Sequence, residues 1–417
     1  MQLKRVVVTG LGALTPLGNT VEEFWQGLVA GVSGAAPITR FDASKFRTRF
    51  ACEVKNFDVT QFIPRQDARK MDPFTQYAMV VAEQAIQDAN FDLSALDLDR
   101  VGVIWGSGSG GLKSFEDEVI AYAKGDGTPR FNPFFITKMI ADSASGQISI
   151  KYGFRGPNYV TVSACASTNN AVIDAFTYIR LGKIKVCLTG GSEAAITQAG
   201  IGGFNANRAM SERNDDPTTA SRPYDKDRDG FVLGEGGACL VLEEYEHAKA
   251  RGATIYCELL GAGLSSDAYH ITAPHPVGYG AFLAMKDALD DADLQPSDVD
   301  YINTHGTSTP IGDPQELKAI ERLFGEAAFD MNISSTKSMT GHLLGGAGAV
   351  EAVASVLAIR HQLVPPTINH FTDDPTIDPR LNLTFNHAQA RPIDVAISNT
   401  FGFGGHNTCV AFRKITD

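Results

Sequence analysis

The sequence predicts a layered α/β protein, because strand-like and helical segments alternate along the chain. Residues 74–89 and 281–292 have apolar side chains at helical spacing. The chain of 417 residues exceeds the size that one hydrophobic core usually supports, so we expect two domains or two fused halves. Six short apolar runs have the composition of buried strands: residues 5–9, 101–105, 160–162, 186–188, 239–242 and 395–398.

Composition and charge exclude several classes of protein. Hydrophobic residues make up 43% and charged residues 20% of the chain, as in ordinary globular proteins. A net charge of −12 argues against broad nucleic-acid binding. The sequence has no apolar run near the roughly 20 residues that span a bilayer, and no signal-peptide pattern. We therefore expect a cytoplasmic protein that binds neither nucleic acid nor membrane.

Parts of the sequence occur twice in the same order. The helical segment AIQDANF (85–91) resembles ALDDADL (288–294), and each leads into a strand that ends in glycine, at 100–106 and 300–306. Further on, the glycine-rich segments GEGG and GFGG each precede a strand. The shared order indicates a duplicated α/β unit whose two halves face each other.

The proposed duplication also gives a domain boundary. The region 249–253 is a plausible seam, so we predict halves at 1–252 and 253–417. A weaker match between the helices after Cys165 and His342 places these residues near the starts of corresponding helices. We therefore expect both halves to contribute chemistry.

Cys165 is the first candidate for a reactive group. The segment 159–176 changes from strand to helical periodicity at this residue. A thiol at a helix N-terminus faces unpaired N–H groups and the positive end of the dipole, so we expect a lowered pKa. The same N–H groups could hold an oxyanion. The six cysteines lack CxxC spacing, so neither a zinc site nor a disulfide framework is indicated, and five are expected to be buried structural thiols: Cys52, Cys187, Cys239, Cys257 and Cys409.

Two histidine segments are the next candidates. His305 ends a strand and is followed by Thr307 and Thr309, so its imidazole could donate to a carbonyl while the hydroxyls hold an extended ligand. In a second segment, Lys337 and His342 stand five residues apart before a glycine-rich helix. Glu351 lies on that apolar helix, where we expect it to have a partner.

The glycine-rich segment near the C-terminus, residues 398–407, follows a strand. It lacks the lysine and hydroxyl residues of a phosphate-binding P-loop. Its two aromatic residues, Phe401 and Phe403, are better explained by a gate or by an oxyanion-binding loop.

These motifs together resemble the β-ketoacyl-carrier-protein synthase family, most closely the type II elongating synthases of bacterial fatty-acid synthesis. The resemblance runs from VVVTGLGALTPLG to FGFGGHN and includes SRPYDKDRDGFVLGEGG at 221–237. It implies a thiolase-like, duplicated αβαβα layered sandwich and a homodimer.

The resemblance also implies roles for individual residues. Cys165 would be the nucleophile, His305 and His342 the histidine pair, and Lys337 and Glu351 their supports. The remaining roles are implied as follows: Phe403 and Gly402 at the gate beside the oxyanion hole, Thr307 and Thr309 on the pantetheine arm, Phe231 over the malonyl group, and Phe401 and Ser109 at the substrate. Ser109 stands where the enzymes that it resembles tend to carry a bulky aliphatic side chain in the acyl pocket.

The implied reaction is the decarboxylative condensation of a malonyl carrier thioester with an acyl group held on Cys165. It gives a 3-oxoacyl product and CO₂, and needs no metal or other cofactor because the substrates carry their own phosphopantetheine. Service in a type II polyketide or aryl-polyene pathway is the alternative to fatty-acid elongation.

The implied partner is an acyl carrier protein, which is expected to be acidic. A chain with a net charge of −12 therefore needs a local basic patch to bind it. The candidates are Arg65, Arg69 and Lys70, expected on one helical face, together with Arg130 and Arg208. Ordinary solvated surface charge remains an alternative reading of these residues.

Three rival functions fit the sequence less well. A thiolase would carry a second cysteine near the C-terminus, and the terminal loop has none. A non-catalytic, chain-length-setting subunit would lack the nucleophile, and Cys165 is present. A cysteine hydrolase would need water at the acyl-enzyme, which condensation must exclude.

Overall fold

The computed structural model describes residues 3–415. Its centre is a ten-stranded sheet in the order β10-β9-β13-β14-β8-β1-β7-β6-β4-β5. The first half of the chain supplies β1 (Val6–Leu14), β4 (Val101–Gly106), β5 (Asn158–Thr161), β6 (Val186–Glu193) and β7 (Gly236–Glu244). The second half supplies β8 (Cys257–Ser266), β9 (Tyr301–Asn303), β10 (Asn332–Ser334), β13 (Val395–Gly402) and β14 (His406–Arg413).

The two sets of strands have the same topology. In each set the spatial order is first, fifth, fourth, second and third strand along the chain. The second strand pairs in parallel with both of its neighbours, and the fifth pairs antiparallel with both of its own. A short antiparallel contact between Val6–Val8 and Cys257–Leu259 joins the sets. The predicted duplication is thus confirmed.

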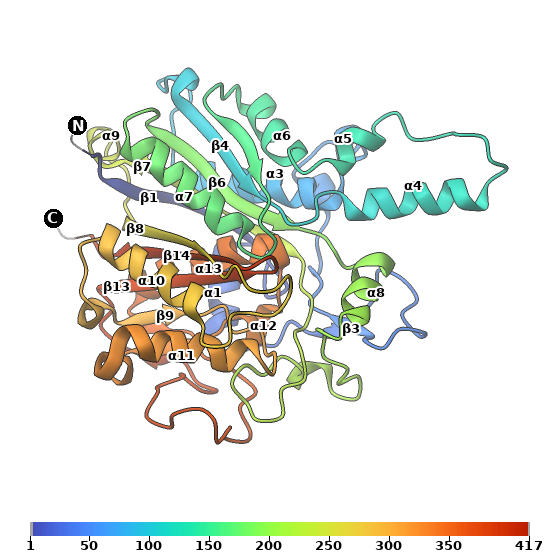
Figure 1. Ribbon diagram of the computed structural model, residues 1–417. Coiled ribbons are helices and arrows are strands. Elements are labelled where there is room, and N and C mark those ends of the chain that lie inside the picture. The colour runs from blue at the N-terminus through green and yellow to red at the C-terminus, as the bar shows by residue number, and fades with distance from the viewer. Residues whose placement is uncertain (1–2, 416–417) are drawn as a thin grey trace.

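Helices form three layers around these strands, as Figure 1 shows. Two buried helices, α7 and α13, contact strands of both halves and each other. On the outer faces, α3 packs on the first set of strands and α10 on the second. The result is the predicted αβαβα arrangement. The bounds are α3 (Pro73–Asp88), α6 (Ser143–Tyr152), α7 (Ser167–Arg180), α10 (Tyr279–Asp291), α11 (Gly312–Phe324) and α13 (Ala347–His361).

The hydrophobic core is continuous between the halves. One cluster of buried side chains includes Val6 and Leu240 from the first half and Tyr301 and Phe412 from the second. The α13 helix is buried around its whole circumference up to Ile359, which explains why its sequence is apolar on every face. The position of α13, and of the residues just before it, is therefore fixed from all sides.

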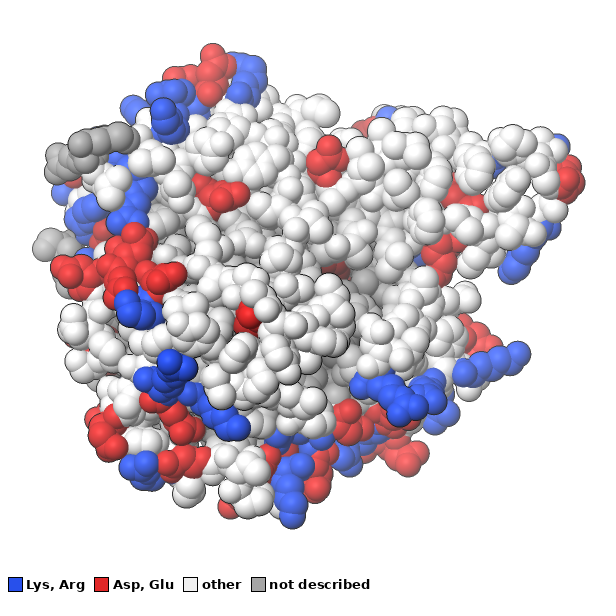
Figure 2. Space-filling model, viewed as in Figure 1, with Lys and Arg blue, Asp and Glu red and all other residues white. Residues whose placement is uncertain are grey.

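The remaining elements surround this framework. The α4–α5 segment forms an arm that extends away from the body in Figure 1, and its surface in Figure 2 is largely uncharged. No helix among residues 3–415 has both the length and the apolar character needed to cross a membrane. The bounds are α1 (Val21–Val29), α2 (Arg65–Ala68), α4 (Leu112–Lys124), α5 (Phe135–Met139), α8 (Gln198–Ala206), α9 (Tyr245–Ala250) and α12 (Lys337–Thr340), with small sheets of β2 (Ala36–Pro37) with β3 (Phe50–Ala51) and β11 (Leu363–Val364) with β12 (Gln389–Ala390).

Corresponding glycines bring each outer helix onto its strand. A Cβ atom at Gly12 of β1 would overlap the carbonyl oxygen of Val81 in α3, and one at Gly263 of β8 would overlap that of Ala284 in α10. Each half therefore uses glycine at the same helix–strand contact, because no side chain fits there.

We expect Gly263→Ala to destabilise the protein by about 2 kcal/mol or more, since the new methyl group must displace helix backbone. Gly146→Ala in α6 is the matched control, because its Cβ would meet nothing within 4 Å and alanine favours a helix. Thermal unfolding of both variants measures the difference. Equal melting temperatures for the two variants would contradict this account of the helix–strand contact.

Candidate active site

Cys165 lies in the turn that joins β5 to α7. The turn is sharp because Ala164 has a left-handed backbone with φ of 51°, a conformation that costs energy for a residue other than glycine. Ser167 stabilises it, because its hydroxyl donates to the carbonyl of Ala164 at 2.6 Å and accepts from the N–H of Ser163 at 2.9 Å. Cys165 is thereby held next to the N-terminus of α7, as the sequence pattern predicts.

His342 reaches the sulfur from the second half. It lies between α12 and α13, and its backbone is anchored on both sides: its N–H donates to Val232 O at 2.7 Å, and its carbonyl accepts from Gly234 N–H at 2.9 Å. Its ring atom Nε2 lies 3.1 Å from Sγ of Cys165. The ring of Phe231 packs edge-on against the imidazole at 5.4 Å between centroids.

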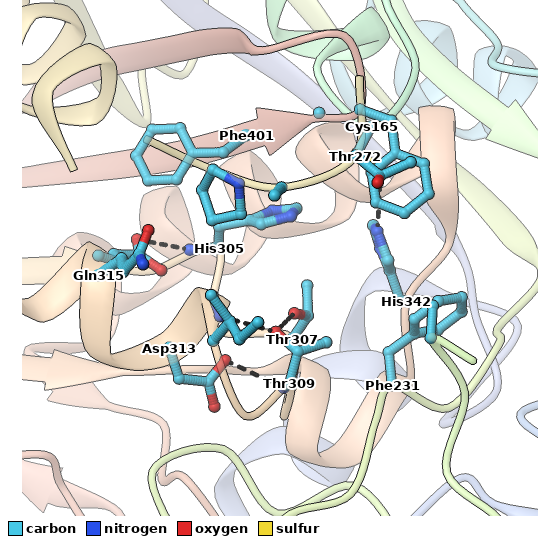
Figure 3. A pocket seen from close by; sticks show the side chains of 18 of the residues that line it. Cys165, Phe231, Thr272, His305, Thr307, Thr309, Asp313, Gln315, His342 and Phe401 are labelled. Carbon is cyan, nitrogen blue, oxygen red and sulfur yellow. Dashed lines mark hydrogen bonds between the residues drawn. The ribbon is translucent and has the colours of Figure 1, made fainter. Parts of the chain in front are cut away.

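His305 completes the group just beyond the end of β9. Its ring centroid lies 5.2 Å from that of His342, and Figure 3 shows both imidazoles near Cys165. Glu316 of α11 fixes the backbone here by accepting from the N–H groups of His305 and Gly306 at 2.8 Å each. The sequence analysis missed Glu316, because the signal is only a carboxylate on a helix that otherwise resembles a surface helix.

Lys337 and Glu351 form a buried ion pair behind the histidines. Both side chains are almost fully buried, at 1% and 2% exposure, so the partner expected for Glu351 is found. Burial lowers the pKa of His305 and of His342 well below the usual histidine value, and the positive charge of Lys337 lowers each further. Both imidazoles are therefore neutral at neutral pH and able to donate a hydrogen bond.

The expected lowering of the Cys165 pKa is wrong. Burial raises the pKa of this thiol to about 12, although the charge of Lys337 and the backbone N–H of Phe403 act in the opposite direction. Desolvation outweighs the helix N-terminus because the sulfur lies below the surface without a cation in contact. The thiol is thus protonated in the free protein, and its proton must leave during any reaction.

The glycine-rich loop closes over the sulfur. The backbone N–H of Phe403 faces Sγ of Cys165, where it favours the ionised thiol and so acts to lower its pKa. A Cβ at Gly402 would lie 2.9 Å from Ser163 O and 3.0 Å from Cys165 N, so only glycine permits this approach. Phe401 lies beside His305, with 5.8 Å between ring centroids. The loop therefore brings its backbone close to the turn that carries Cys165.

Two cavities meet at Cys165. The first, of about 440 Å³, is lined by both histidines, by Thr307 and Thr309, whose hydroxyls lie 3.1 Å apart, and by Phe231. The second, of about 370 Å³, is also lined by Cys165 and Phe403. Its remaining walls are mostly small or apolar: Gly108, Ser109, Leu112, Ala164, Ala195, Ala199, Gly200, Gly203, Phe204, Asn207 and Leu344. One sulfur atom can therefore be approached by two different ligands.

The threonine loop of the first cavity is held by a second ion cluster that sequence analysis also missed. Arg228 donates to the carbonyl of Thr309 at 3.1 Å, and Asp313 accepts from the N–H of the same residue at 3.3 Å. Burial raises the pKa of Asp313 to about 6, while Arg228 opposes that shift. The loop is thus fixed on both sides, so Thr307 and Thr309 present a rigid surface.

The five basic residues predicted for docking are all exposed. Arg208 lines the first cavity, and Arg130 lies in the connection between α4 and α5. The expectation that Arg65, Arg69 and Lys70 share one helical face is wrong, because α2 is a single turn that ends at Ala68. Arg69 caps this turn and Lys70 lies beyond it, so the three charges are clustered but do not form a stripe.

One group of side chains among the described residues has donors suited to a metal ion. Sγ of Cys165 and ring nitrogens of His305 and His342 lie within 4.8 Å of one another, and such atoms are zinc ligands. A metal held there would occupy the sulfur and the imidazoles that the two cavities share.

Comparison with known proteins identifies the family. Residues 3–248 match the family described as "Beta-ketoacyl synthase, N-terminal domain", and residues 256–371 match its C-terminal domain. The chain belongs to the β-ketoacyl synthase family. It is an acyltransferase of the condensing type.

Relatives and solved structures support this over the full length. The chain is 53% identical to a 3-oxoacyl-[acyl-carrier-protein] synthase 2 of Synechocystis sp. and 49% identical to one of Staphylococcus aureus, covering 99% of each chain. A β-ketoacyl synthase structure from Burkholderia phymatum superposes with a TM-score of 0.91 at 36% identity, covering 99% of this chain and all of that one.

We expect Lys337→Ala to raise the pKa of both active-site imidazoles, because a neighbouring cation disfavours their protonated forms. Lys337→Arg keeps the charge and is the matched control. Histidine side-chain NMR across pH 4–8 measures both titrations, with the other histidines as internal references. Unchanged titration midpoints in Lys337→Ala would show that the cation does not act on the rings.

Proposed function

We propose that this β-ketoacyl synthase is a 3-oxoacyl-acyl-carrier-protein synthase that lengthens acyl chains in fatty-acid synthesis. The observation that carries the proposal is the meeting of two cavities at Cys165, whose sulfur lies 3.1 Å from Nε2 of His342. A condensing enzyme must hold one substrate covalently while a second reaches the same atom.

The first step is acyl transfer. Sγ of Cys165 attacks the carrier thioester, the carbon–sulfur bond to pantetheine breaks, and the thiol proton leaves with the pantetheine sulfur. The oxyanion is stabilised by the N–H groups of Cys165 and Phe403. The acyl chain then occupies the second cavity, whose small side chains leave room for it.

The second step is condensation. Malonyl thioester enters the first cavity, with its pantetheine arm along Thr307 and Thr309 and its malonyl group under Phe231. His305 and His342, both neutral, donate to the thioester oxygen and stabilise the enolate that forms as CO₂ leaves. The enolate carbon attacks the acyl carbonyl, the bond to Sγ breaks to release the 3-oxoacyl product, and the Cys165 thiolate takes up a proton from water. Lys337 and Glu351 support the neutral histidines.

Identity favours fatty-acid elongation over polyketide service. The curated relatives at 49–53% identity are named 3-oxoacyl-[acyl-carrier-protein] synthase 2. A ketosynthase of a type II polyketide system, solved with its acyl carrier protein, superposes well, with a TM-score of 0.90, but is only 35% identical. The fold is therefore common to both pathways, and the sequence lies nearer to the elongating enzymes.

A homodimer is part of the proposal. The β5 strand ends the sheet, and its outer edge pairs with no strand among the described residues; the nearby Val162 and Ile150 are 63% and 77% exposed. Further apolar side chains are exposed on the α4–α5 arm: Phe115, Val119, Tyr122, Phe131, Phe134, Ile136 and Ile140. Such a surface is typical of a protein interface, and a second copy would cover both edge and arm by two-fold symmetry.

The remaining parts of the proposal concern cofactor and location. No cofactor enters either step, since the carrier's phosphopantetheine delivers both substrates. All six cysteines are free and buried, as expected for a reducing compartment, and we place the enzyme in the cytoplasm. Activity that persists after dialysis against a chelator would agree with the metal-free chemistry.

Replacement of the nucleophile tests the reaction. We expect Cys165→Ala to lose all acylation, and Cys165→Gln to keep decarboxylation of malonyl carrier protein, because the histidines remain. Intact-protein mass spectrometry detects the acyl group, and released CO₂ reports the second activity. A mass gain on the alanine variant equal to that of the wild type would refute the assignment of the nucleophile.

Charge reversal tests carrier docking. We expect Arg208→Glu at the rim of the first cavity to weaken binding of an acidic carrier protein roughly tenfold at low salt, because an attractive contact becomes repulsive. Lys183→Glu is the control, since this exposed residue follows α7 at the end remote from Cys165. Fluorescence anisotropy at 20 and 200 mM salt measures both. An equal loss in the two variants would indicate only the change in net charge.

A further inference from the structure

A buried carboxylate lies behind the second cavity and has no role in the chemistry above. Glu193, the last residue of β6, is fully buried, and no cation among the described residues lies within ion-pairing distance of it. Its oxygens accept from the backbone N–H of Gly108 at 2.7 Å, of Ser109 at 3.1 Å and of Gly345 at 3.1 Å. The hydroxyl of Ser109 also donates to it, as does that of Ser107 at 3.4 Å.

The donors come from both halves of the chain. Gly108 and Ser109 follow β4 and line the second cavity. Gly345 precedes α13, and its carbonyl accepts from the hydroxyl of Thr168 in α7, the helix next to Cys165. A Cβ at Gly345 would overlap the backbone of Gly108. The carboxylate therefore holds the cavity wall at 108–109 against the segment that precedes α13.

A carboxylate is needed because every partner is a donor. An ionised acid accepts at both oxygens, and charged acceptors form stronger hydrogen bonds than neutral ones. Glutamine at this position could accept at only one oxygen. Its NH₂ group, which is a donor, would face backbone N–H groups that are also donors. The wall would then lose contacts that no other buried group can replace.

Resting on the proposed function, we propose that Glu193 is a positioning residue that sets the wall of the acyl cavity and so governs which chain lengths acylate Cys165 efficiently. Ser109 is exposed on that cavity wall. A long acyl chain lies along this wall, whereas a short one ends near the sulfur. Each methylene that loses its contact with the wall costs about fourfold in binding, so displacement of the wall penalises long chains most.

Glu193→Gln tests the inference by a ratio of rates. We expect the efficiency of Cys165 acylation by a palmitoyl carrier protein to fall about tenfold or more, and that by a butyryl carrier protein by a clearly smaller factor. Initial rates from intact-protein mass spectrometry give both values. Ser109→Ala removes one of the five donors and should change the ratio in the same direction by a smaller amount.

Glu53→Gln is the matched control. Glu53 is also buried, and accepts from the N–H groups of Thr39 at 2.9 Å and Arg40 at 3.2 Å, but lines neither cavity. We expect it to leave the palmitoyl-to-butyryl ratio as in the wild type. A ratio that falls equally in this control would show a general loss of stability and overturn the inference.

The charge of Glu193 supplies a second readout. It raises the pKa of the Cys165 thiol, so the glutamine variant should shift the pH profile of alkylation by iodoacetamide to lower pH. An equal loss for both chain lengths, or an unchanged ratio, overturns the inference. If Glu193→Gln does not fold, an unchanged palmitoyl-to-butyryl ratio in Ser109→Ala overturns the inference instead. Failure of the wild type to be acylated at all would instead refute the proposed function.

Discussion

The active site depends on two helices that are buried side by side between the halves of the molecule. The α7 and α13 helices contact strands of both sets and each other, and the residues just before them carry Cys165 and His342. The α13 helix is buried on every side up to Ile359, and α7 buries most of its residues, so both helices are held by close packing. The distance between sulfur and imidazole is therefore set by the packing of the whole core, and no flexible loop has to create it.

Burial also determines the protonation of the site. The same desolvation that keeps both imidazoles neutral raises the pKa of the thiol, so the reacting groups rest in uncharged forms. The positive charge of Lys337 acts on all three groups, and its pairing with Glu351 makes this charge tolerable in the core. Uncharged imidazoles suit a reaction in which negative charge develops on a substrate oxygen, since they can donate without first losing a proton.

The sequence predicted the parts of this arrangement that local pattern determines. Strand-to-helix periodicity located Cys165, repeated segments revealed the duplication, and an acid in an apolar helix indicated a partner for Glu351. The unusual pKa of the thiol could not be predicted, because desolvation depends on the packing of distant segments. The sequence analysis missed three buried acids for a related reason: Glu316, Asp313 and Glu193. Each accepts hydrogen bonds from backbone N–H groups, and a backbone N–H group leaves no signal in the sequence.

The glycines explain why so much of the site is backbone. Gly402 lies against the turn that carries Cys165, and Gly345 against Gly108, in contacts too close for any side chain. Where main chains meet without side chains between them, the available donors are backbone N–H groups. The N–H of Phe403 faces the sulfur of Cys165. The N–H groups of Gly108, Ser109 and Gly345 donate to Glu193. N–H groups on packed backbone keep their orientation when the substrate changes. They therefore suit a site where the same sulfur first accepts an acyl chain and later releases it.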